Sequence, residues 1–292
     1  MSTCPICGAE LFVGLRSWHL VCGVCGYEGS TLNAHILSQA PGGDLDEVAR
    51  EDALETLRRS NFQRLLAAIR GLTSKTSSCQ HPMRLLDVGC AHGWFLEQAR
   101  GNFDATGIEP DRGVAEATAA RGLRVRKGFF PDVLATDERY DIIVFNDVLE
   151  HIPDINATLQ ACMLHLVPGG LLVINAPNRM GTLYRVSKNL LRLGRSGTFD
   201  RMWQLGFPSP HVHYLDTEAV TALAERHGFT LLASERLPSV SISGLYSRVR
   251  YSKDVSPVKA LLLTLAVAVA IPALAVLPPD IEVWFLRREP DA

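Results

Sequence analysis

The sequence predicts an α/β protein with a doubly wound, mostly parallel sheet of seven strands and a small cysteine-rich module at the N-terminus. From Arg84 onward, apolar runs of strand length alternate with helical patterns, which is typical of a parallel sheet covered on both faces. A glycine-rich turn follows the first of these strands, and two Cys-x-x-Cys pairs open the chain. We therefore expect a module at 1–32, a helical linker at 44–80 and a large domain at 81–292.

The predicted elements of the large domain follow in order along the chain. Helical patterns over 111–121, 154–166 and 216–228 separate several of the apolar runs. The strands that we expect are Arg84–Val88, Ala105–Glu109, Leu123–Arg126, Tyr140–Asn146, Gly170–Ala176, Phe229–Glu235 and Ile281–Leu286. In such a sheet a ligand binds at the carboxyl ends of the strands, near the point where the strand order reverses.

The composition of the chain bears on two questions: whether it binds nucleic acid, and in which cellular compartment it resides. The chain has 292 residues, 47% of them hydrophobic, and a formal net charge of -2, so nothing favours binding to nucleic acid. It begins with a polar segment, where a secretory signal would place a basic and then an apolar run. An odd number of cysteines, seven, suits a reducing compartment. We expect a cytoplasmic protein, with peripheral contact at the inner membrane face as an option.

The cysteine pairs, Cys4 with Cys7 and Cys22 with Cys25, are separated by 14 residues and each is followed by glycine. Two such pairs can present four thiolates to one tetrahedral Zn²⁺, and a closed site of this kind is structural because no coordination position stays open. The alternative is four reduced thiols without a metal. His19, three residues before Cys22, could replace one thiolate, but we expect it at the surface.

The glycine-rich turn, Gly89-Cys-Ala-His-Gly93, lies between a strand and a helical pattern, where a bare backbone lets a ligand approach a helix N-terminus. Glu109 ends the next strand, 20 residues beyond Gly89, at the distance from which an acid can accept both ribose hydroxyls. A dinucleotide fingerprint needs glycine at the sixth position of the turn, where Trp94 stands. A dinucleotide cofactor is therefore disfavoured.

The segment Leu85–Phe95 resembles motif I of class I methyltransferases, in which an acid precedes Gly-x-Gly-x-Gly, although the middle glycine is Ala91 here. Segments 140–153 and 166–175 resemble those around strands four and five of the small-molecule branch, which includes ubiquinone-pathway methyltransferases. The resemblance implies a Rossmann-like methyltransferase fold and S-adenosyl-L-methionine as methyl donor. It also implies cofactor contacts: the methionine moiety near Asp87, Gly89, Ala91, Gly93 and Asn146, the ribose at Glu109, and the adenine near Phe129 or Phe130.

A base is needed only if the acceptor carries a proton that must leave during methyl transfer. The candidates are His151, after Glu150, and His211 or His213 in a segment that closes over the acceptor pocket in similar proteins. We take His151 and His213 as the catalytic candidates. The alternative for each is a structural hydrogen bond to the backbone.

Residues 260–277 are 18 consecutive positions without a charge, inside an apparent insertion at about 256–279. Their length suits a membrane span, but Ile281–Leu286 reads as the last strand of the sheet and should stay on the same side as the rest. We therefore expect a helix, interrupted by Pro272, that lies in the membrane interface or covers an apolar entrance to the active site. A helix buried against the sheet or a dimer partner is the alternative.

These patterns predict transfer of a methyl group from S-adenosyl-L-methionine to oxygen, carbon or nitrogen of a small-molecule or lipid-linked acceptor. The first alternative is rRNA methylation guided by the zinc module, which the missing basic patch opposes. Methylation of adenine amino groups is further disfavoured because Asn146 is followed by Asp-Val-Leu and not by Pro-Pro-aromatic. The second alternative is a non-catalytic binding module. The sequence predicts neither the acceptor nor the oligomeric state.

Overall fold

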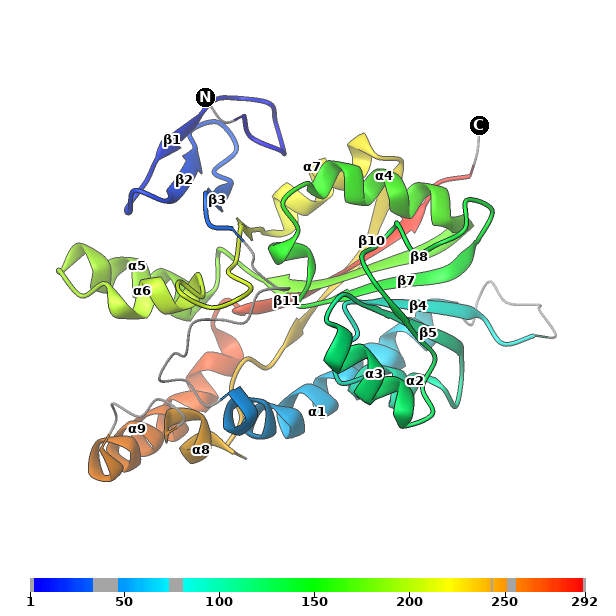
Figure 1. The fold of residues 1–292 in the computed structure, drawn as a ribbon. Helices are drawn as coiled ribbons and strands as arrows, with labels where there is room; N and C mark the ends of the chain where they lie inside the picture. The colour runs from blue at the N-terminus through cyan, green and yellow to red at the C-terminus, as the bar shows by residue number, and fades with distance from the viewer. Residues whose placement is uncertain (1–2, 34–46, 74–80, 243, 251–255, 291–292) are drawn as a thin grey trace.

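The computed structural model describes residues 3–33, 47–73, 81–242, 244–250 and 256–290 (Figure 1). Its centre is a seven-stranded sheet in the order β10-β11-β8-β7-β4-β5-β6. β4 is parallel to β5 and β7, as β7 is to β8 and β5 to β6, whereas β11 is antiparallel to both of its neighbours. The strands are β4 (Arg84–Val88), β5 (Asp104–Glu109), β6 (Val125–Lys127), β7 (Tyr140–Asn146), β8 (Leu166–Pro177), β10 (Phe229–Leu237) and β11 (Ile281–Arg288). The predicted fold class is confirmed.

The strand order reverses between β4 and β7, because the chain runs from β4 out to β6 and then returns to pair β7 with the other side of β4. The carboxyl ends of β4, β5 and β7 meet at this switch point, where sheets of this type bind ligands. Glu109 ends β5 and Asn146 ends β7. The topology therefore brings together side chains that are far apart in the sequence.

Helices cover both faces of the sheet: α1, α2 and α3 lie on one side, and α4 and α7 on the other (Figure 1). Asp111, Asp154 and Asp216 accept a hydrogen bond from a backbone N–H of the first turn of α3, α4 and α7, respectively. Such caps stabilise a helix by about 1 kcal/mol each. The helices are α1 (Glu47–Thr73), α2 (Trp94–Ala99), α3 (Arg112–Ala120), α4 (Ile155–His165), α5 (Thr182–Arg192), α6 (Gly197–Met202), α7 (Thr217–Arg226), α8 (Leu245–Arg250) and α9 (Pro257–Val276).

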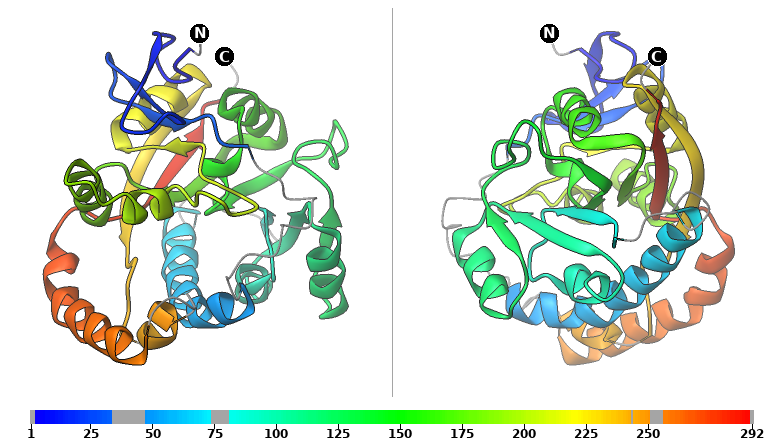
Figure 2. Two further views of the ribbon diagram at one scale, coloured as in Figure 1. Left: turned by 60° about the vertical axis from the view of Figure 1, so that its left-hand side comes forward. Right: turned by 90° about the vertical axis from the view of Figure 1, so that its right-hand side faces the viewer.

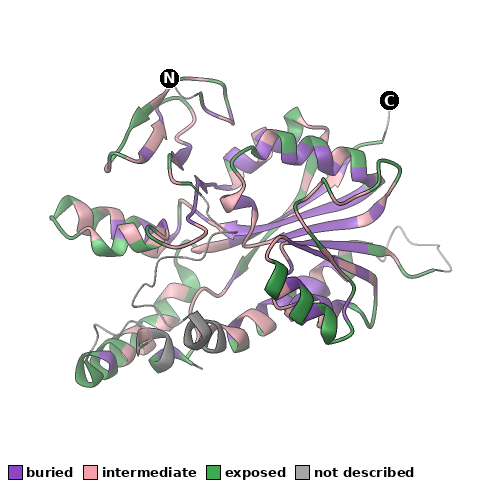
Figure 3. Cartoon of the chain, viewed as in Figure 1, coloured by how far each residue is buried: buried purple, intermediate pink, exposed green. Residues whose placement is uncertain are grey.

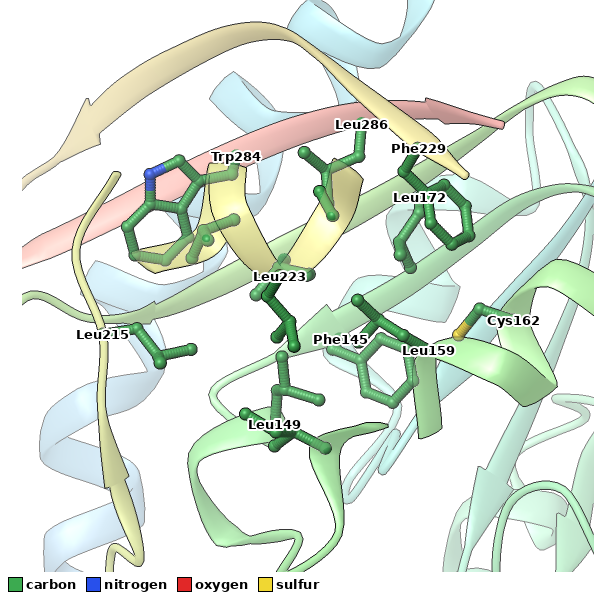
Figure 4. Close-up of a cluster of buried hydrophobic side chains, with 14 of the residues drawn as sticks. Phe145, Leu149, Leu159, Cys162, Leu172, Leu215, Leu223, Phe229, Trp284 and Leu286 are labelled. Atoms are coloured by element: carbon green, nitrogen blue, oxygen red, sulfur yellow. The ribbon is translucent and has the colours of Figure 1, made fainter. Parts of the chain in front are cut away.

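The sheet is buried between two apolar layers, so that its strands form the buried centre of the molecule (Figure 3). On one face, Leu159 and Cys162 of α4 and Leu223 of α7 pack against the sheet (Figure 4). On the other face, Phe62 and Leu65 of α1 join the side chains of α2. The segment predicted as a helical linker thus contains α1, which packs on the sheet through a buried stripe; positions 44–46 and 74–80 of the prediction lie outside the described residues.

The N-terminal strands β1 (Leu11–Val13), β2 (His19–Cys22) and β3 (Glu28–Ser30) form an antiparallel sheet. Its fourth strand is β9 (His213–Tyr214) of the large domain, which pairs with β3. The module therefore shares a sheet with the domain that it precedes. The arm formed by α8 and α9 lies at the opposite end of the molecule from this module (Figure 2).

Candidate active site

The four cysteines of the N-terminal module converge on one point. The sulfur atoms of Cys4 and Cys25 are 3.5 Å apart, as are those of Cys7 and Cys22, and all four lie within 4.8 Å of one another. Four sulfurs at about 2.3 Å from one zinc ion would be about 3.8 Å apart. Although burial raises the pKa of the Cys22 thiol, the N–H groups of Cys25 and Val24 lower it to about 7, which favours the thiolate. The donor set fits a structural Zn²⁺.

His19 is buried, with 1% of its surface exposed, so its expected surface position is wrong. Its Nε2 lies 2.9 Å from Oε2 of the Glu28 carboxylate. The same oxygen accepts a hydrogen bond from Tyr184, and Oε1 accepts one from Lys188. Burial raises the pKa of Glu28, but the bond from His19 and the charge of Lys188 outweigh it and hold the pKa at about 2. An ionised carboxylate thus links the module to α5. The sequence gives no signal for this link, because its partners are more than 150 residues apart.

The predicted glycine-rich turn joins β4 to α2 in a left-handed conformation. Gly89 and Gly93 have φ of 70°, and Ala91 adopts φ of 44°. A Cβ atom at Gly89 would lie 2.6 Å from Val148, so this position excludes a side chain as well. The turn exposes backbone at the switch point of the sheet.

Glu109 faces this turn from the end of β5. Its carboxylate accepts hydrogen bonds from the backbone N–H of Ala91, at 3.0 Å, and of Asp111, at 2.8 Å, through different oxygens. Burial raises the pKa of Glu109, and the two N–H donors lower it in part. Each oxygen has a further lone pair, so the carboxylate can still accept two hydroxyl groups.

Asp87, in β4, and Asn146, at the end of β7, meet beside the turn. The Asn146 Nδ2 donates to Asp87 Oδ1 at 3.2 Å, whereas the Asn146 Oδ1 is buried without a hydrogen-bond partner among the described residues. Burial, with a smaller contribution from the charge of Glu109, raises the pKa of Asp87 to about 8, although the hydrogen bond from Asn146 lowers it in part. A carboxylate and an unsatisfied amide oxygen together favour a cationic, hydrogen-bond-donating ligand.

These residues line a crevice of about 40 Å³ that α1 covers with Arg58 and Phe62. The Phe62 ring packs edge-on against Phe95 of α2, with 5.4 Å between ring centres. A second cavity of about 110 Å³ shares Arg58 and Phe62 with the crevice and is also lined by Asp147 and Asn175. The sequence analysis missed Arg58, Phe62, Asp147 and Asn175.

Phe129, predicted near adenine, follows the end of β6 and is 45% exposed. Phe130 turns the other way, toward the core, and packs edge-on against Phe145 at 5.7 Å between ring centres. Phe129 is thus the more exposed of the two phenylalanines, and Phe130 is half-buried.

His151 belongs to a polar cluster beyond β7. The cluster consists of Glu150, His151 and His211. One side-chain nitrogen or carboxylate oxygen from each of the three lies within 4.8 Å of the others. The Nδ1 of His151 donates to the carbonyl oxygen of Pro210 at 2.9 Å, which leaves Nε2 directed to the Glu150 carboxylate at 4.0 Å. Glu150 is fully buried and neither of its oxygens has a hydrogen-bond partner among the described residues, so burial raises its pKa well above the usual value.

His213 has both ring nitrogens in structural hydrogen bonds. Its Nε2 donates to the carbonyl oxygen of Ile152 at 2.8 Å, so its Nδ1 accepts from the hydroxyl of Tyr27. Burial lowers the pKa of His213 to about 4 and keeps the ring neutral. This geometry opposes the catalytic role predicted for His213 and matches the structural alternative.

Three comparisons place the chain among known proteins. Residues 57–234 match the family model described as "Methyltransferase domain". Ubiquinone biosynthesis O-methyltransferase of Pectobacterium carotovorum is 26% identical over 66% of this chain and 87% of its own length. The enzyme of the same description from Bradyrhizobium is 32% identical, but over 36% of this chain and 44% of its own length. The structure of an S-adenosylmethionine-dependent methyltransferase from Archaeoglobus fulgidus superposes with a TM-score of 0.52 at 16% identity, covering 83% of this chain and 99% of that one.

The family model covers more than half of the chain and includes the turn at Gly89, Glu109 and the end of β7. The chain therefore belongs to the methyltransferase domain family, and the predicted class of S-adenosylmethionine-dependent methyltransferase is confirmed.

Proposed function

We propose that the protein transfers the methyl group of S-adenosyl-L-methionine to a hydroxyl oxygen of an apolar, lipid-linked small molecule. The observation that carries this proposal is the juxtaposition of Asp87, Glu109 and Asn146 around the Gly89 turn. Oxygen is chosen as the acceptor atom because the relatives reported above are named O-methyltransferases. RNA and a purely binding role are left out, because nothing in the site or the family match favours either.

Each part of the methyl donor has a matching group of residues in or near the crevice. Glu109 would hold the ribose hydroxyls, and Asp87 with the free Oδ1 of Asn146 would hold the ammonium of the methionine moiety. Gly89, Ala91 and Gly93 would supply the bare backbone against which the methionine lies, and Phe129 would cover the adenine. When bound, the donor supplies an electrophilic methyl group on a sulfonium.

His151 is our candidate for the base. An attacking hydroxyl must lose its proton, and an imidazole can accept it near neutral pH. Nε2 is the atom that would take the proton, because Nδ1 already donates to Pro210. The positive charge on His151 would favour ionisation of the nearby Glu150 carboxyl, and the carboxylate would then offset that charge. We assign His213 a structural role.

The route for the acceptor runs under α1. The cavity that contains Asp147 shares Leu57 and Ser239 with an outer cavity of about 590 Å³ between α1, the segment after β10 and α9. The outer cavity is lined mostly by apolar side chains, among them Ile271 and Leu274 of α9. The crevice and the two cavities are neighbours that share lining residues, and we propose that a bound acceptor spans them, with a polar head near Asp147 and an apolar tail toward α9.

α9 is the part of the path that we propose contacts the membrane. Of the described residues, only α9 is long and apolar enough to qualify as a span by length and composition, and 6% of its most apolar stretch is buried. Apolar side chains such as Leu261, Leu265 and Val269 are more than half exposed. A helix that is apolar all round belongs in an apolar medium.

The strands on either side of the insertion, β10 and β11, pair with each other, which ties both ends of the arm to one body. This favours a helix that lies in the interface over one that crosses the bilayer. We propose a cytoplasmic enzyme that is peripheral at the inner membrane face.

The proposal is tested by incubating the protein with methyl-labelled S-adenosylmethionine and a bacterial membrane lipid extract. We expect label in the organic phase that survives mild base, which hydrolyses esters but not methyl ethers. Label that mild base releases, or an unlabelled organic phase from protein that binds the cofactor, would exclude the proposed acceptor class.

A further inference from the structure

β3 and the residues next to it contact the large domain at β9, beside the polar cluster of His151, and at α5 through Glu28. β3 pairs with β9 through Glu28 opposite Tyr214 and Gly29 opposite His213. Ser30 extends this pairing, because its backbone N–H donates to Val212 at 3.0 Å and its hydroxyl donates to the His211 carbonyl at 2.8 Å.

Residues 210–214, held in this way, form the wall of the polar cluster. The carbonyl of Pro210 accepts from His151 Nδ1, and the backbone N–H of Val212 donates to the Glu150 carbonyl at 2.7 Å. The rings of His151 and His211 lie 4.8 Å apart. The orientation of His151 therefore depends directly on where this segment lies.

Tyr27 provides a second, buried connection. It lies two residues after Cys25 and is 2% exposed. Its hydroxyl donates to His213, which passes the connection on to the carbonyl of Ile152, the residue after His151. Two chains of hydrogen bonds thus run from the module toward one short turn: one ends within Leu149–His151 and the other at Ile152, directly after it.

We propose that the zinc module positions the acceptor side of the active site: Tyr27 and Ser30 are positioning residues that fix His151 through residues 210–214. The inference rests on the proposed role of His151. Loss of zinc, or of either connection, impairs methyl transfer and leaves cofactor binding intact, because the cofactor crevice is formed by β4, β5, β7 and α1. Zinc occupancy thereby determines whether the enzyme turns over its acceptor.

The test uses the full-length, zinc-loaded protein carrying Tyr27→Phe or Ser30→Ala, each of which removes one hydroxyl and little volume. Ser30→Thr keeps a hydroxyl and serves as the rescue variant, and Phe12→Ala, on the exposed side of β1, is the matched control in the same module. Amide hydrogen exchange is measured at 149–153 and 210–214, and at 85–93 for comparison, together with calorimetric binding of S-adenosylhomocysteine.

We expect about tenfold faster exchange at 149–153 and 210–214 in Tyr27→Phe and Ser30→Ala, from the loss of one buried hydrogen bond. Exchange at 85–93 and the affinity for S-adenosylhomocysteine stay within about twofold, and Ser30→Thr and Phe12→Ala behave as wild type. In the lipid-extract assay, kcat falls about tenfold with an unchanged KM for the methyl donor. Zinc removal by a chelator gives the same pattern.

Unchanged exchange at 149–153 in both variants would overturn the proposal, as would a parallel loss of protection at 85–93, which would show a global effect. If wild-type protein fails to bind S-adenosylhomocysteine, the proposed function fails instead, and the exchange data still decide whether the module holds the turn.

Discussion

Arg58 of α1 and Asp147, the residue after β7, form an ion pair across the mouth of the candidate active site, with 3.7 Å between Nη2 and Oδ2. Arg58 lines both the cofactor crevice and the cavity next to it. Asp147 has a positive φ of 54°, a conformation that non-glycine residues adopt rarely. The pair thus closes α1 over the point where donor and acceptor would meet.

Removing this ion pair should weaken the packing of α1 over the crevice without unfolding the protein. Both side chains are about a third exposed, so the pair contributes about 1 kcal/mol or less. We expect Arg58→Met to speed dissociation of S-adenosylhomocysteine by about fivefold in stopped-flow measurements, with Tm nearly unchanged. Arg70→Met, at the exposed end of the same helix, is the control. An unchanged dissociation rate would show that α1 does not gate the cofactor.

Ionisation of Asp87 should lower the free energy of unfolding as pH rises, and it should favour binding of the ammonium group of the cofactor. The Asp87 pKa of about 8 in the folded protein, raised by burial, exceeds the value of about 3.9 expected for the unfolded chain. Between these values the folded state holds more protons, so the contribution of Asp87 to the free energy of unfolding declines as pH rises from about 4 to about 8. Asp87→Asn removes this dependence.

We therefore expect the Tm of Asp87→Asn to rise relative to wild type as pH increases toward 8, and the two proteins to differ least near pH 4. The same variant should bind S-adenosylhomocysteine at least about tenfold more weakly, because an amide cannot pair with an ammonium. Calorimetric scans and titrations of both proteins across this pH range make the test. A Tm difference independent of pH contradicts the buried, titrating Asp87.

The imidazole of His151 should be needed for chemistry and not for cofactor binding. We expect His151→Ala to lower kcat for label transfer into the lipid extract by a factor of about 10² to 10⁴, the usual contribution of a positioned base. Binding of S-adenosylhomocysteine should stay within about twofold. His213→Asn serves as the comparison, since its effect should appear mainly as a lower Tm. Full activity in His151→Ala would remove it from the proton pathway.

The exposed face of α9 should bind anionic membranes. Leu261 and Leu265 lie one helical turn apart, and Lys259 is near the start of the helix. We expect wild-type protein to sediment with vesicles of equal parts phosphatidylglycerol and phosphatidylcholine, and Leu261→Glu/Leu265→Glu to remain in solution. Leu193→Glu, at an equally apolar exposed position after α5, is the control. The wild type could fail to bind vesicles and instead form a dimer that the α9 substitutions disrupt. That result would show that α9 packs against a second copy of the chain.

The sequence analysis predicted best the parts of the structure that local pattern determines. The strands Arg84–Val88 and Tyr140–Asn146 begin and end as predicted, because each has a short apolar centre, Leu85–Leu86 and Ile142–Phe145, that is buried between the helical layers and flanked by polar residues. The turn at Gly89 and the carboxylate of Glu109 lie side by side as expected, because strand–turn–helix geometry sets their spacing, and their contacts with the methyl donor stay a prediction. The helices α5 and α6, by contrast, were not predicted.

The parts that were missed depend on contacts between distant segments. Arg58 and Phe62 line the crevice because α1 packs across the sheet. The spacing of residues in the sequence does not predict this packing. His19 was expected at the surface because its partner, the ionised Glu28, becomes available only when α5 supplies Lys188. His213 was predicted as a catalytic candidate, and its two hydrogen bonds, which favour the structural alternative, form only because β3 pairs with β9.

The central claim is that Glu109, at the tip of β5, holds the ribose of S-adenosyl-L-methionine. Isothermal titration calorimetry with S-adenosylhomocysteine tests it most directly, by comparing wild type with Glu109→Ala. We predict binding in the micromolar range for wild type and a loss of about tenfold or more in the variant, from the loss of charge-assisted hydrogen bonds. Equal affinities in the two proteins would contradict the assignment of this crevice to the methyl donor.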